Sequence, residues 1–479
     1  MKVHLAGHNS DYQELQKLIA SSDSKAVLTP ETLSAAYARI SRSPKPVNEL
    51  RKEACKDVYK SRKSNENIVF EMGHSSIAEH AVFNFDILNI SRLAVEELEH
   101  FRLASFTEKS QRYVTLDNDY VIPKEIQNDA EILALYKETV AGQFDFYQKL
   151  FEKLKVYFYA KDPKTAEYFA KEDARYILPL AMDAQLGMTL NCRSLEAMLR
   201  KFASSSLLEV KELGEMLYDK VKDIVPSLIR YHSKTDYNSD KFKDLAEYIP
   251  IEDKFFSYIN NDQVKLVDYT KDIDNKIITS IIHSKEGFAY PLLYNRVKRL
   301  SKDKKKEIFK RTFKYIHSYD KVLREFEFAN FTFELIISSS CFAQLKRHRI
   351  ATLTKQNYDP VLGITKPESV KAIGMGEEYL AKIKKINHVF ETIKAKYNHE
   401  TAEYILTNSH KRRALFQINL RELYHISRLR EDAHAQWDIR DVTYEMVQLA
   451  KKQAPMALML AGGKHEFQKK YQEVYSIKN

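Results

Sequence analysis

Clustered arginines and histidines are the side chains in this sequence best suited to chemistry. Residues 347–349 read Arg-His-Arg at the end of a predicted helix. Two guanidinium groups there can form paired hydrogen bonds with phosphate oxygens, while the helix presents further donors. Basic triplets at helix ends also commonly do no more than complement the helix dipole and the last carbonyls. Taken alone, the triplet leaves both a phosphate site and an ordinary helix terminus open.

Other candidate side chains are ambiguous in the same way. Residues 73–80, GHSSIAEH, could be a capped turn before a strand, with His74 an ordinary polar contact. Cys55, Cys192 and Cys341 show no CxxC pairing, so we expect neither a disulfide nor a structural zinc site, and no metal site is predicted. We interpret Cys192 and Cys341 as small core residues.

Two predicted strands, each followed by a helix, must position the basic residues. Alternating apolar residues predict strands over 80–87 and 326–335. Each strand leads into a predicted short helix, over 93–102 and 341–349, that delivers a basic motif. Elsewhere, apolar residues at three- and four-residue spacing predict further helices, as over 208–224 and 441–452.

The same motifs occur twice along the chain. Residues 100–113 read HFRLASFTEKSQRY, and residues 347–358 read RHRIATLTKQNY. The same interval of fifteen residues separates Tyr176 from Asn191 and Tyr404 from Asn419. Matched motifs and matched spacings indicate an internal duplication.

Each copy is long enough to be a domain with its own core. The chain has 479 residues, of which 44% are hydrophobic, which is ample material for two cores. We predict one domain over 1–235 and a second over 236–479. The boundary is placed in the polar stretch 232–240, which is rich in turn-forming residues.

Charge and hydropathy indicate which kind of ligand and which cellular location to expect. The net charge is +10, which would suit nucleic acid or phosphorylated small molecules. No aromatic-interleaved basic motif appears, so we expect small-molecule ligands and no nucleic acid. Lysine-rich stretches such as 302–306 are interpreted as solvated helix faces. The first residues form no apolar signal core and no apolar run is long enough for a membrane span, so a cytoplasmic protein without a membrane partner is expected.

Taken in order, these elements resemble the flavin-dependent thymidylate synthases of the ThyX type. That family has a GHxSxxEH segment, then RHRxxSxxExSxRY, then NxRSLxHFLxLRxxxxAQxEIR. The first half of this chain has GHSSIAEH, HFRLASFTEKSQRY and NCRSLEAMLRK, and the second has RHRIATLTKQNY and NLRELYHISRLREDAHAQWDIR. The resemblance covers most of both halves. It implies an α+β fold with two tandem domains, each helix-rich around an antiparallel sheet.

The two halves depart from the family pattern in complementary ways. The second half keeps the glutamine and arginines of the pattern, as Gln344, Arg347 and Arg430, where the first half has Glu97, His100 and Phe202. The first half keeps an acid, a serine and two arginines, as Glu108, Ser110, Arg112 and Arg175, where the second has Lys355, Asn357, Asp359 and Glu403. If one copy had simply lost its function, the predicted ligand residues would be missing from that half alone. The pattern therefore favours a composite active site built from both domains.

The resemblance also implies residue roles. Arg430 would be the catalytic residue, because its charge would stabilise negative charge that develops on the pyrimidine. The dUMP ligands would be Gln344, Arg347, Arg430, Glu108, Ser110, Arg112 and Arg175. The FAD ligands would be His74, Ser76, Arg347, His348, Arg349, Asn419, Arg421 and His425, with Asn191 and Arg193 lining a second, vestigial or rearranged, flavin pocket.

The activity implied is the conversion of dUMP to dTMP. Methylenetetrahydrofolate would supply the carbon and FAD, reduced by NADPH, the hydride, without an enzyme nucleophile. Ser110, which resembles a nucleophile in isolation, would bind phosphate instead. A homodimer would replace the family's tetramer. Two alternatives stay open: a flavin enzyme that methylates or hydroxymethylates another pyrimidine nucleotide, and a non-catalytic nucleotide-binding or assembly protein.

Overall fold

The computed structural model describes residues 1–21, 27–112, 119–239 and 262–476. Tyr113, the last residue of the first basic motif, and Asp240, the last residue of the predicted boundary stretch, lie outside these ranges. Among the described residues, no helix combines the length and the apolar character that a membrane crossing requires.

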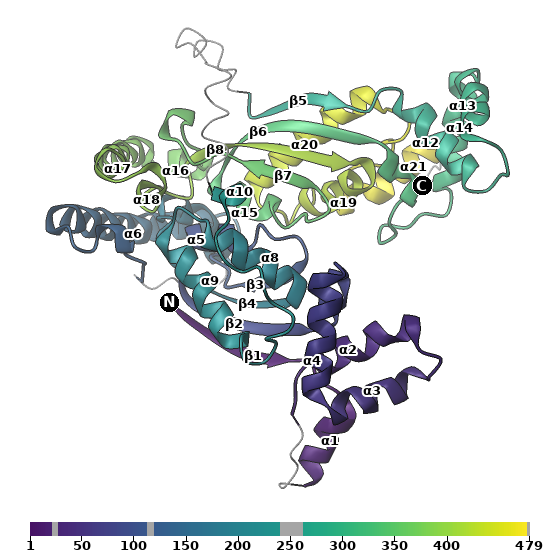
Figure 1. The fold of residues 1–479 in the computed structure, drawn as a ribbon. Coiled ribbons are helices and arrows are strands. Elements are labelled where there is room, and N and C mark those ends of the chain that lie inside the picture. Colours follow the sequence, from purple (N-terminus) through teal and green to yellow (C-terminus); the bar gives the residue numbers. More distant parts are fainter. Residues whose placement is uncertain (22–26, 113–118, 240–261, 477–479) are drawn as a thin grey trace. The chain divides into compact units, whose positions relative to one another are not determined.

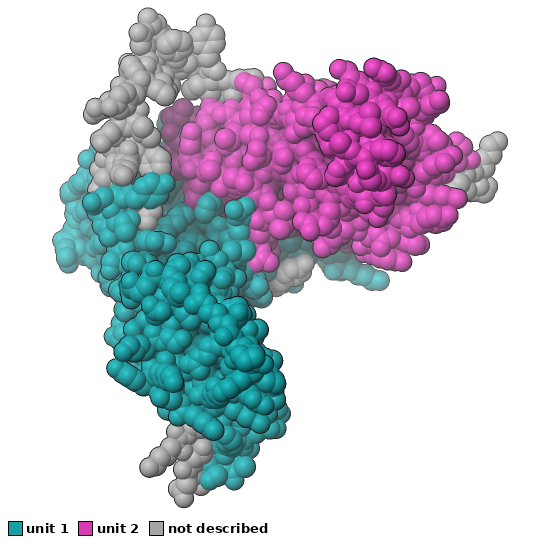
Figure 2. All heavy atoms as spheres, turned by 45° about the vertical axis from the view of Figure 1, so that its right-hand side comes forward, with its two compact units in different colours: residues 1–171, 178–257, 377–406 teal, residues 172–177, 258–376, 407–479 magenta. Residues whose placement is uncertain are grey.

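The chain divides into two compact units, each assembled from discontinuous segments (Figure 2). Unit 1 contains Met1–Lys171, Leu178–Ser257 and Glu377–Leu406. Unit 2 contains Glu172–Ile177, Tyr258–Gly376 and Thr407–Asn479. Each unit therefore includes a segment from the other half of the sequence. The predicted boundary between residues 235 and 236 refers to the duplication along the chain and stays a prediction.

Each unit contains one four-stranded antiparallel sheet (Figure 1). In unit 1 the order is β1 (Lys2–His8), β2 (Val82–Ser91), β4 (Asp183–Asn191) and β3 (Ala104–Glu108). In unit 2 the order is β5 (Val264–Tyr269), β6 (Asn330–Ser338), β8 (Lys411–Asn419) and β7 (Thr352–Lys355). The same strand order in both units matches the duplication, and the helix-rich α+β architecture is confirmed.

Helices make up most of the rest of each unit. The first half of the chain contains α1 (Tyr12–Ala20), α2 (Glu31–Arg39), α3 (Val47–Lys56), α4 (Val58–Glu66), α5 (Arg92–Leu98), α6 (Ala130–Tyr159), α7 (Ala166–Ala174), α8 (Cys192–Ala203) and α9 (Leu208–Val221). Beyond these come α10 (Asp236–Ser239), α12 (Ile273–His283), α13 (Tyr290–Lys298), α14 (Lys302–Phe313), α15 (Ser339–Leu345), α16 (Glu368–Ala372), α17 (Gly376–Lys396), α18 (His399–Glu403), α19 (Leu420–Arg430), α20 (Trp437–Gln453) and α21 (Phe467–Tyr475).

Short helical turns connect several of these elements. They are η1 (Ile40–Arg42), the π-helical η2 (Asn67–Glu71), η3 (Ser75–His80), η4 (Lys124–Ile126), η5 (Arg175–Ile177), η7 (Arg324–Phe328), η8 (Pro360–Leu362) and η9 (Lys464–Glu466).

The predicted strands begin later in the structure than the sequence pattern suggests. The prediction over 326–335 is wrong in its first residues, which form η7, and β6 starts only at Asn330. Asn330 pairs with Asn419, the last residue of β8. The pairing continues only to the Ala329 carbonyl, which accepts from the backbone N–H of Leu420 at 2.8 Å, and earlier residues would lie beyond the end of β8. The prediction over 80–87 is corrected in the same way, because β2 starts at Val82, opposite Asn191 at the end of β4.

The short helices after these strands are also displaced from their predicted bounds. Helix α5 is Arg92–Leu98 rather than 93–102, and α15 is Ser339–Leu345 rather than 341–349. Their starts are fixed by serine caps: Ser91 Oγ accepts from the backbone N–H of Ala94, and Ser338 Oγ from that of Cys341. The Arg-His-Arg triplet therefore lies in the turn after α15.

Unit 1 is completed by a long helix from each half of the chain. Helix α6 packs beside α17, where Phe146 and Tyr379 rings lie 6.1 Å apart. At the other end of the pair, Asp129 Oδ2 accepts from the Tyr397 hydroxyl at 2.8 Å and lies 2.6 Å from Lys396 Nζ. The backbone N–H of Leu180 donates to the Leu406 carbonyl at 2.7 Å. These contacts explain why 377–406 belongs to unit 1.

Candidate functional site

A buried histidine holds the arginine that the sequence places at the centre of the site. Arg430, the last residue of α19, donates from Nε to His348 Nε2 at 3.1 Å. The other ring nitrogen, Nδ1, lies 3.1 Å from Glu422 Oε1 and donates to it. Burial is the main cause that lowers the pKa of His348, and Arg430 adds to the effect. A neutral imidazole results, which can accept from the guanidinium and donate to the carboxylate at once.

Gln344 lies in the same cluster. Its backbone carbonyl is 3.5 Å from Arg430 Nη2, and its side-chain Nε2 donates to Gln436 Oε1 at 3.2 Å. Gln344, His348 and Arg430 are thus brought together in unit 2, as the motif pattern predicts. Arg347 and Arg349, in the turn after α15, are exposed.

Arg175 belongs to the same unit although it comes from the first half of the chain. It starts the short helix η5, and its backbone carbonyl accepts from Asn408 Nδ2 at 2.9 Å. The next residue, Tyr176, accepts at its carbonyl from Ser409, and its ring stacks on Trp437 with centroids 5.4 Å apart. Asp173 accepts from Trp437 Nε1 at 2.9 Å. The segment Glu172–Ile177 belongs to unit 2 and therefore places Arg175, a predicted ligand from the first half of the chain, in that unit.

The acid–serine–arginine loop lies in unit 1. Glu108 ends β3 and forms an ion pair with Arg92, whose side chain is only 5% exposed. Ser110 Oγ accepts from the backbone N–H of Arg112 at 3.3 Å, and Arg112 Nη1 donates to the Tyr168 hydroxyl at 2.8 Å. Sequence reasoning missed Arg92, because it lies in no motif and opens a helix that reads as ordinary core.

Two phenylalanines occupy the unit 1 positions that correspond to His348 and Arg430. The motifs align Phe101 with His348 and Phe202 with Arg430. The rings of Phe101 and Phe202 meet edge to face with centroids 5.7 Å apart. An aromatic pair thus replaces a hydrogen-bonded polar pair, which removes the anion-binding character of this corner of unit 1.

Several predicted flavin ligands also serve as helix caps or form ion pairs. Asn419 Oδ1 accepts from the backbone N–H of Glu422, and Asn191 Oδ1 from that of Ser194. Arg421 donates to Val322 and Glu327, and Arg193 Nη1 lies 2.5 Å from Glu79 Oε1. His74, Ser76 and His425 are exposed. The structure brings His348 and His425 together, with ring centroids 5.9 Å apart.

His348, Glu422 and His425 also form a group whose potential metal-ligand atoms lie within 4.8 Å of one another. Both ring nitrogens of His348 are already hydrogen-bonded, one of them to the guanidinium of Arg430. A divalent cation there would displace that contact and lie beside a fixed positive charge. The donor set therefore suits anion binding, and no metal is assigned to it.

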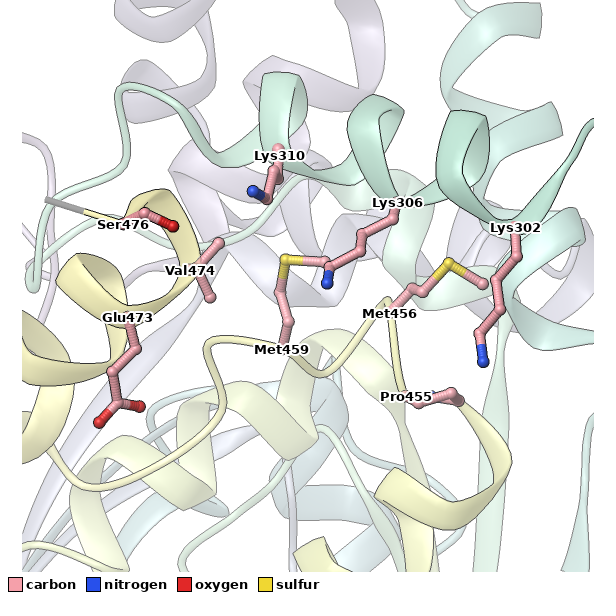
Figure 3. Close-up of a pocket in the computed structure, with 9 residues that line it drawn as sticks. All are labelled: Lys302, Lys306, Lys310, Pro455, Met456, Met459, Glu473, Val474 and Ser476. Carbon is pink, nitrogen blue, oxygen red and sulfur yellow. The ribbon is translucent and has the colours of Figure 1, made fainter.

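Unit 2 has a second basic surface away from these residues. Lys302, Lys306 and Lys310 follow one face of α14 and line a cavity of about 460 Å3 with Met456 and Met459 (Figure 3). Lys302 and Lys306 are exposed, as expected of a solvated helix face. None of the predicted site residues lines this cavity.

A family model described as thymidylate synthase complementing protein matches residues 24–227 and 265–456 of the chain. The chain belongs to this family. Two separate matches in one sequence confirm the resemblance inferred from the motifs, in a tandem form.

Curated relatives agree with the membership. A flavin-dependent thymidylate synthase of Clostridium tetani is 30% identical over 217 residues, which cover 44% of this chain and 85% of that protein. A protein of Thermoplasma acidophilum called UPF0159 protein Ta1429 is 23% identical over 470 residues, covering 88% of this chain and 93% of its own length. This relative, unlike the first, spans both copies.

Among solved structures, the UMP/dUMP methylase PolB from Streptomyces cacaoi shares 17% identity with a TM-score of 0.35, over 47% of this chain and 92% of its own. The flavin-dependent thymidylate synthase ThyX from Helicobacter pylori shares 18% identity with a TM-score of 0.31, over 48% of this chain and 100% of its own.

Proposed function

We propose that this chain is a flavin-dependent thymidylate synthase that converts dUMP to dTMP. The observation that carries the proposal is the cluster in unit 2, where a neutral, buried His348 fixes the guanidinium of Arg430 beside Gln344. A fixed cation next to an amide side chain suits a pyrimidine nucleotide, since it can stabilise negative charge on the base without rearranging. Membership in the family supports the same reaction.

The chemistry requires no side-chain nucleophile. Burial raises the pKa of the Cys192 and Cys341 thiols well above its ordinary value, so neither is a ready thiolate. Both are fully buried, which confirms them as core residues. Arg430 would act electrostatically, and Arg175, Gln344 and Arg347 would orient the nucleotide.

The exposed donors around this cluster fit a flavin dinucleotide. Arg347 and Arg349 face solvent in the turn beside buried His348, and such guanidinium groups match the oxygens of a pyrophosphate. His425, Asn419 and Arg421 would complete the FAD contacts, with His74 and Ser76 added from unit 1. When bound, FAD would supply the hydride, with NADPH as its reductant and methylenetetrahydrofolate as the carbon donor.

The remaining dUMP ligands are proposed from the sequence. The complementary losses in the two halves suggest that Glu108, Ser110 and Arg112 contribute to the same nucleotide site as Arg430, in a homodimer. Asn191 and Arg193 would belong to a second, vestigial flavin pocket.

Release of tritium from dUMP labelled at the carbon that gains the methyl group tests the function. Purified protein should be yellow, and it should release tritium only when FAD, NADPH and methylenetetrahydrofolate are all present. Turnover of another pyrimidine nucleotide in place of dUMP would contradict the proposed substrate, and absence of bound flavin would contradict the proposed enzyme class.

A further inference from the structure

A chain of hydrogen-bonded side chains runs through unit 2 and ends at Gln344. Asp438 Oδ2 accepts from the Tyr176 hydroxyl at 3.0 Å and from Ser338 Oγ at 2.5 Å. The Tyr176 oxygen accepts from Gln436 Nε2 at 2.7 Å. Gln436 Oε1 in turn accepts from Gln344 Nε2 at 3.2 Å. Tyr176, Gln436 and Asp438 are at most 1% exposed.

Two backbone N–H groups indicate which atoms donate and which accept in this hydrogen-bonded network. The N–H of Ile439 lies 3.4 Å from Gln436, so the Gln436 atom facing it must be the carbonyl oxygen, and Nε2 must face Tyr176. The N–H of Cys341 occupies an acceptor position of Ser338 Oγ at 3.0 Å, so the serine proton is left for Asp438. The remaining donor, the Tyr176 hydroxyl, also points at Asp438.

The same direction carries through to Gln344. Because Gln436 presents an oxygen, Gln344 must present its amide nitrogen, which is also 3.5 Å from the backbone carbonyl of Ser340. The carboxamide oxygen of Gln344 accepts no hydrogen bond from any residue in the described ranges. The contact between Arg430 and Gln344 is made to the backbone carbonyl of Gln344, not to its side chain. The side chain is therefore oriented with its acceptor, rather than its donor, available to a ligand.

Unit 1 has the same network without the glutamines. Glu209 Oε2 accepts from the Tyr404 hydroxyl at 2.7 Å and from Ser91 Oγ at 2.6 Å, which matches Asp438 with Tyr176 and Ser338. The N-cap position filled by Gln436 in α20 is filled by Leu207 in α9, which makes no side-chain cap. Glu97 stands where unit 2 has Gln344. The tyrosine, acid and serine thus serve both units, whereas the glutamine extension occurs only beside Arg430.

We propose that Gln436 and Tyr176 are positioning residues that make Gln344 present its carboxamide oxygen to the nucleotide, so that the site selects a pyrimidine nucleotide carrying a hydrogen-bond donor at that point. The inference rests on the proposed function. A uracil base offers a ring N–H as donor, whereas cytosine has an unprotonated nitrogen there. The sugar 3′-hydroxyl is a second source of the same chemistry.

Binding of three nucleotides to the FAD-loaded protein tests the proposal. The probes are dUMP, dCMP, which lacks the ring N–H, and 2′,3′-dideoxyuridine monophosphate, which lacks the sugar hydroxyl. The wild type should bind one of the two analogues at least tenfold more weakly than dUMP, because a buried acceptor left unpaired is costly. In Tyr176→Phe the amide of Gln436 loses its 2.7 Å acceptor and keeps only the long 3.4 Å contact with the N–H of Ile439 to orient it. Gln436, and with it Gln344, can then turn over, and that ratio should fall by roughly tenfold.

Tyr404→Phe is the matched control, since it removes the corresponding buried hydroxyl from a buried carboxylate in unit 1. It should leave the ratios at their wild-type values. Gln436→Leu, which copies Leu207, provides a second variant and should lower the same ratio as Tyr176→Phe. Unchanged ratios in both unit 2 variants, or equal changes in Tyr404→Phe, would overturn the proposal. A wild type that binds flavin but none of the nucleotides would instead contradict the proposed function.

Discussion

Corresponding substitutions in the two units should separate stability from activity. Arg430 and Phe202 occupy matching positions at the ends of α19 and α8. Arg430→Ala should lower kcat/KM for dUMP with little effect on folding. Phe202→Ala should do the opposite, lowering the free energy of unfolding while the intrinsic turnover of folded protein persists.

The structure sets the size of both effects. Phe202 is 1% exposed, packs edge to face on Phe101, and leaves only 3.0 Å between its Cβ and a Cβ built on Gly214. Truncating such a ring costs about 3–5 kcal/mol of stability. Arg430 is half-buried and bonded to His348. A lost charge-assisted contact to the nucleotide of roughly 1.5–3 kcal/mol corresponds to a fall in kcat/KM of roughly 10- to 150-fold.

Urea unfolding followed by fluorescence, together with steady-state tritium release, measures the two quantities on the same preparations. The reasoning fails if Arg430→Ala retains near-normal kcat/KM, or if Phe202→Ala is as stable as the wild type. Arg430→Lys separates charge from geometry, because it keeps the charge but loses the planar contact with His348.

Three further predictions concern the composite site and two buried acids. Arg112→Ala and Arg430→Ala chains should each lose activity by roughly 10- to 150-fold alone. On mixing, activity rises above that of either variant only if the two arginines of a site come from opposite chains, and near-normal activity of either variant alone excludes a composite site. Burial raises the pKa of Asp173 from 3.8 to about 6, so the folded state binds the extra proton and stability should fall as pH rises from about 4 to 6. Asp173→Asn should flatten this pH dependence and raise the free energy of unfolding by up to roughly 3 kcal/mol at pH 7. A wild-type denaturation midpoint that does not change between about pH 4 and 6 would count against this prediction. Arg92→Met removes the buried guanidinium that pairs with the Glu108 carboxylate and should lower the free energy of unfolding by about 3–5 kcal/mol. Arg92→Met with Glu108→Gln should recover much of this loss, and equal losses in the single and double variants would contradict the assigned pair.

The motifs predicted the cluster around Arg430 because its members lie close together along the sequence or within one signature. Gln344, Arg347 and His348 occupy a single turn of chain, and Arg430 lies on the helix that the second signature specifies. Strands β2 and β6 were also predictable, apart from their first residues, since alternating residues give buried rows such as Phe83 and Phe85 in β2.

Contacts between distant segments could not be predicted in this way. Tyr176 and Asp438 are 262 residues apart, and no periodic pattern connects them. The sequence shows Gln436 only as one residue of a signature, because its role depends on a tyrosine from the other half of the chain. The bounds of the two short helices were misplaced for a local reason, since capping by Ser91 and Ser338 decides where each helix starts and hydropathy does not register a cap.

Because each unit contains a segment from the other half of the sequence, the order in which the chain is synthesised affects its folding. Glu209 meets the Tyr404 hydroxyl, and the amide of Gln143 meets the Ile405 carbonyl at 2.9 Å, only after the ribosome has passed residue 406. Until then the N-terminal half carries a buried carboxylate and a buried amide that lack these partners. Such closures over more than 190 residues raise the contact order and slow folding. Each unit takes a segment from the other half of the sequence, so neither half of the chain carries all the contacts that complete its own unit.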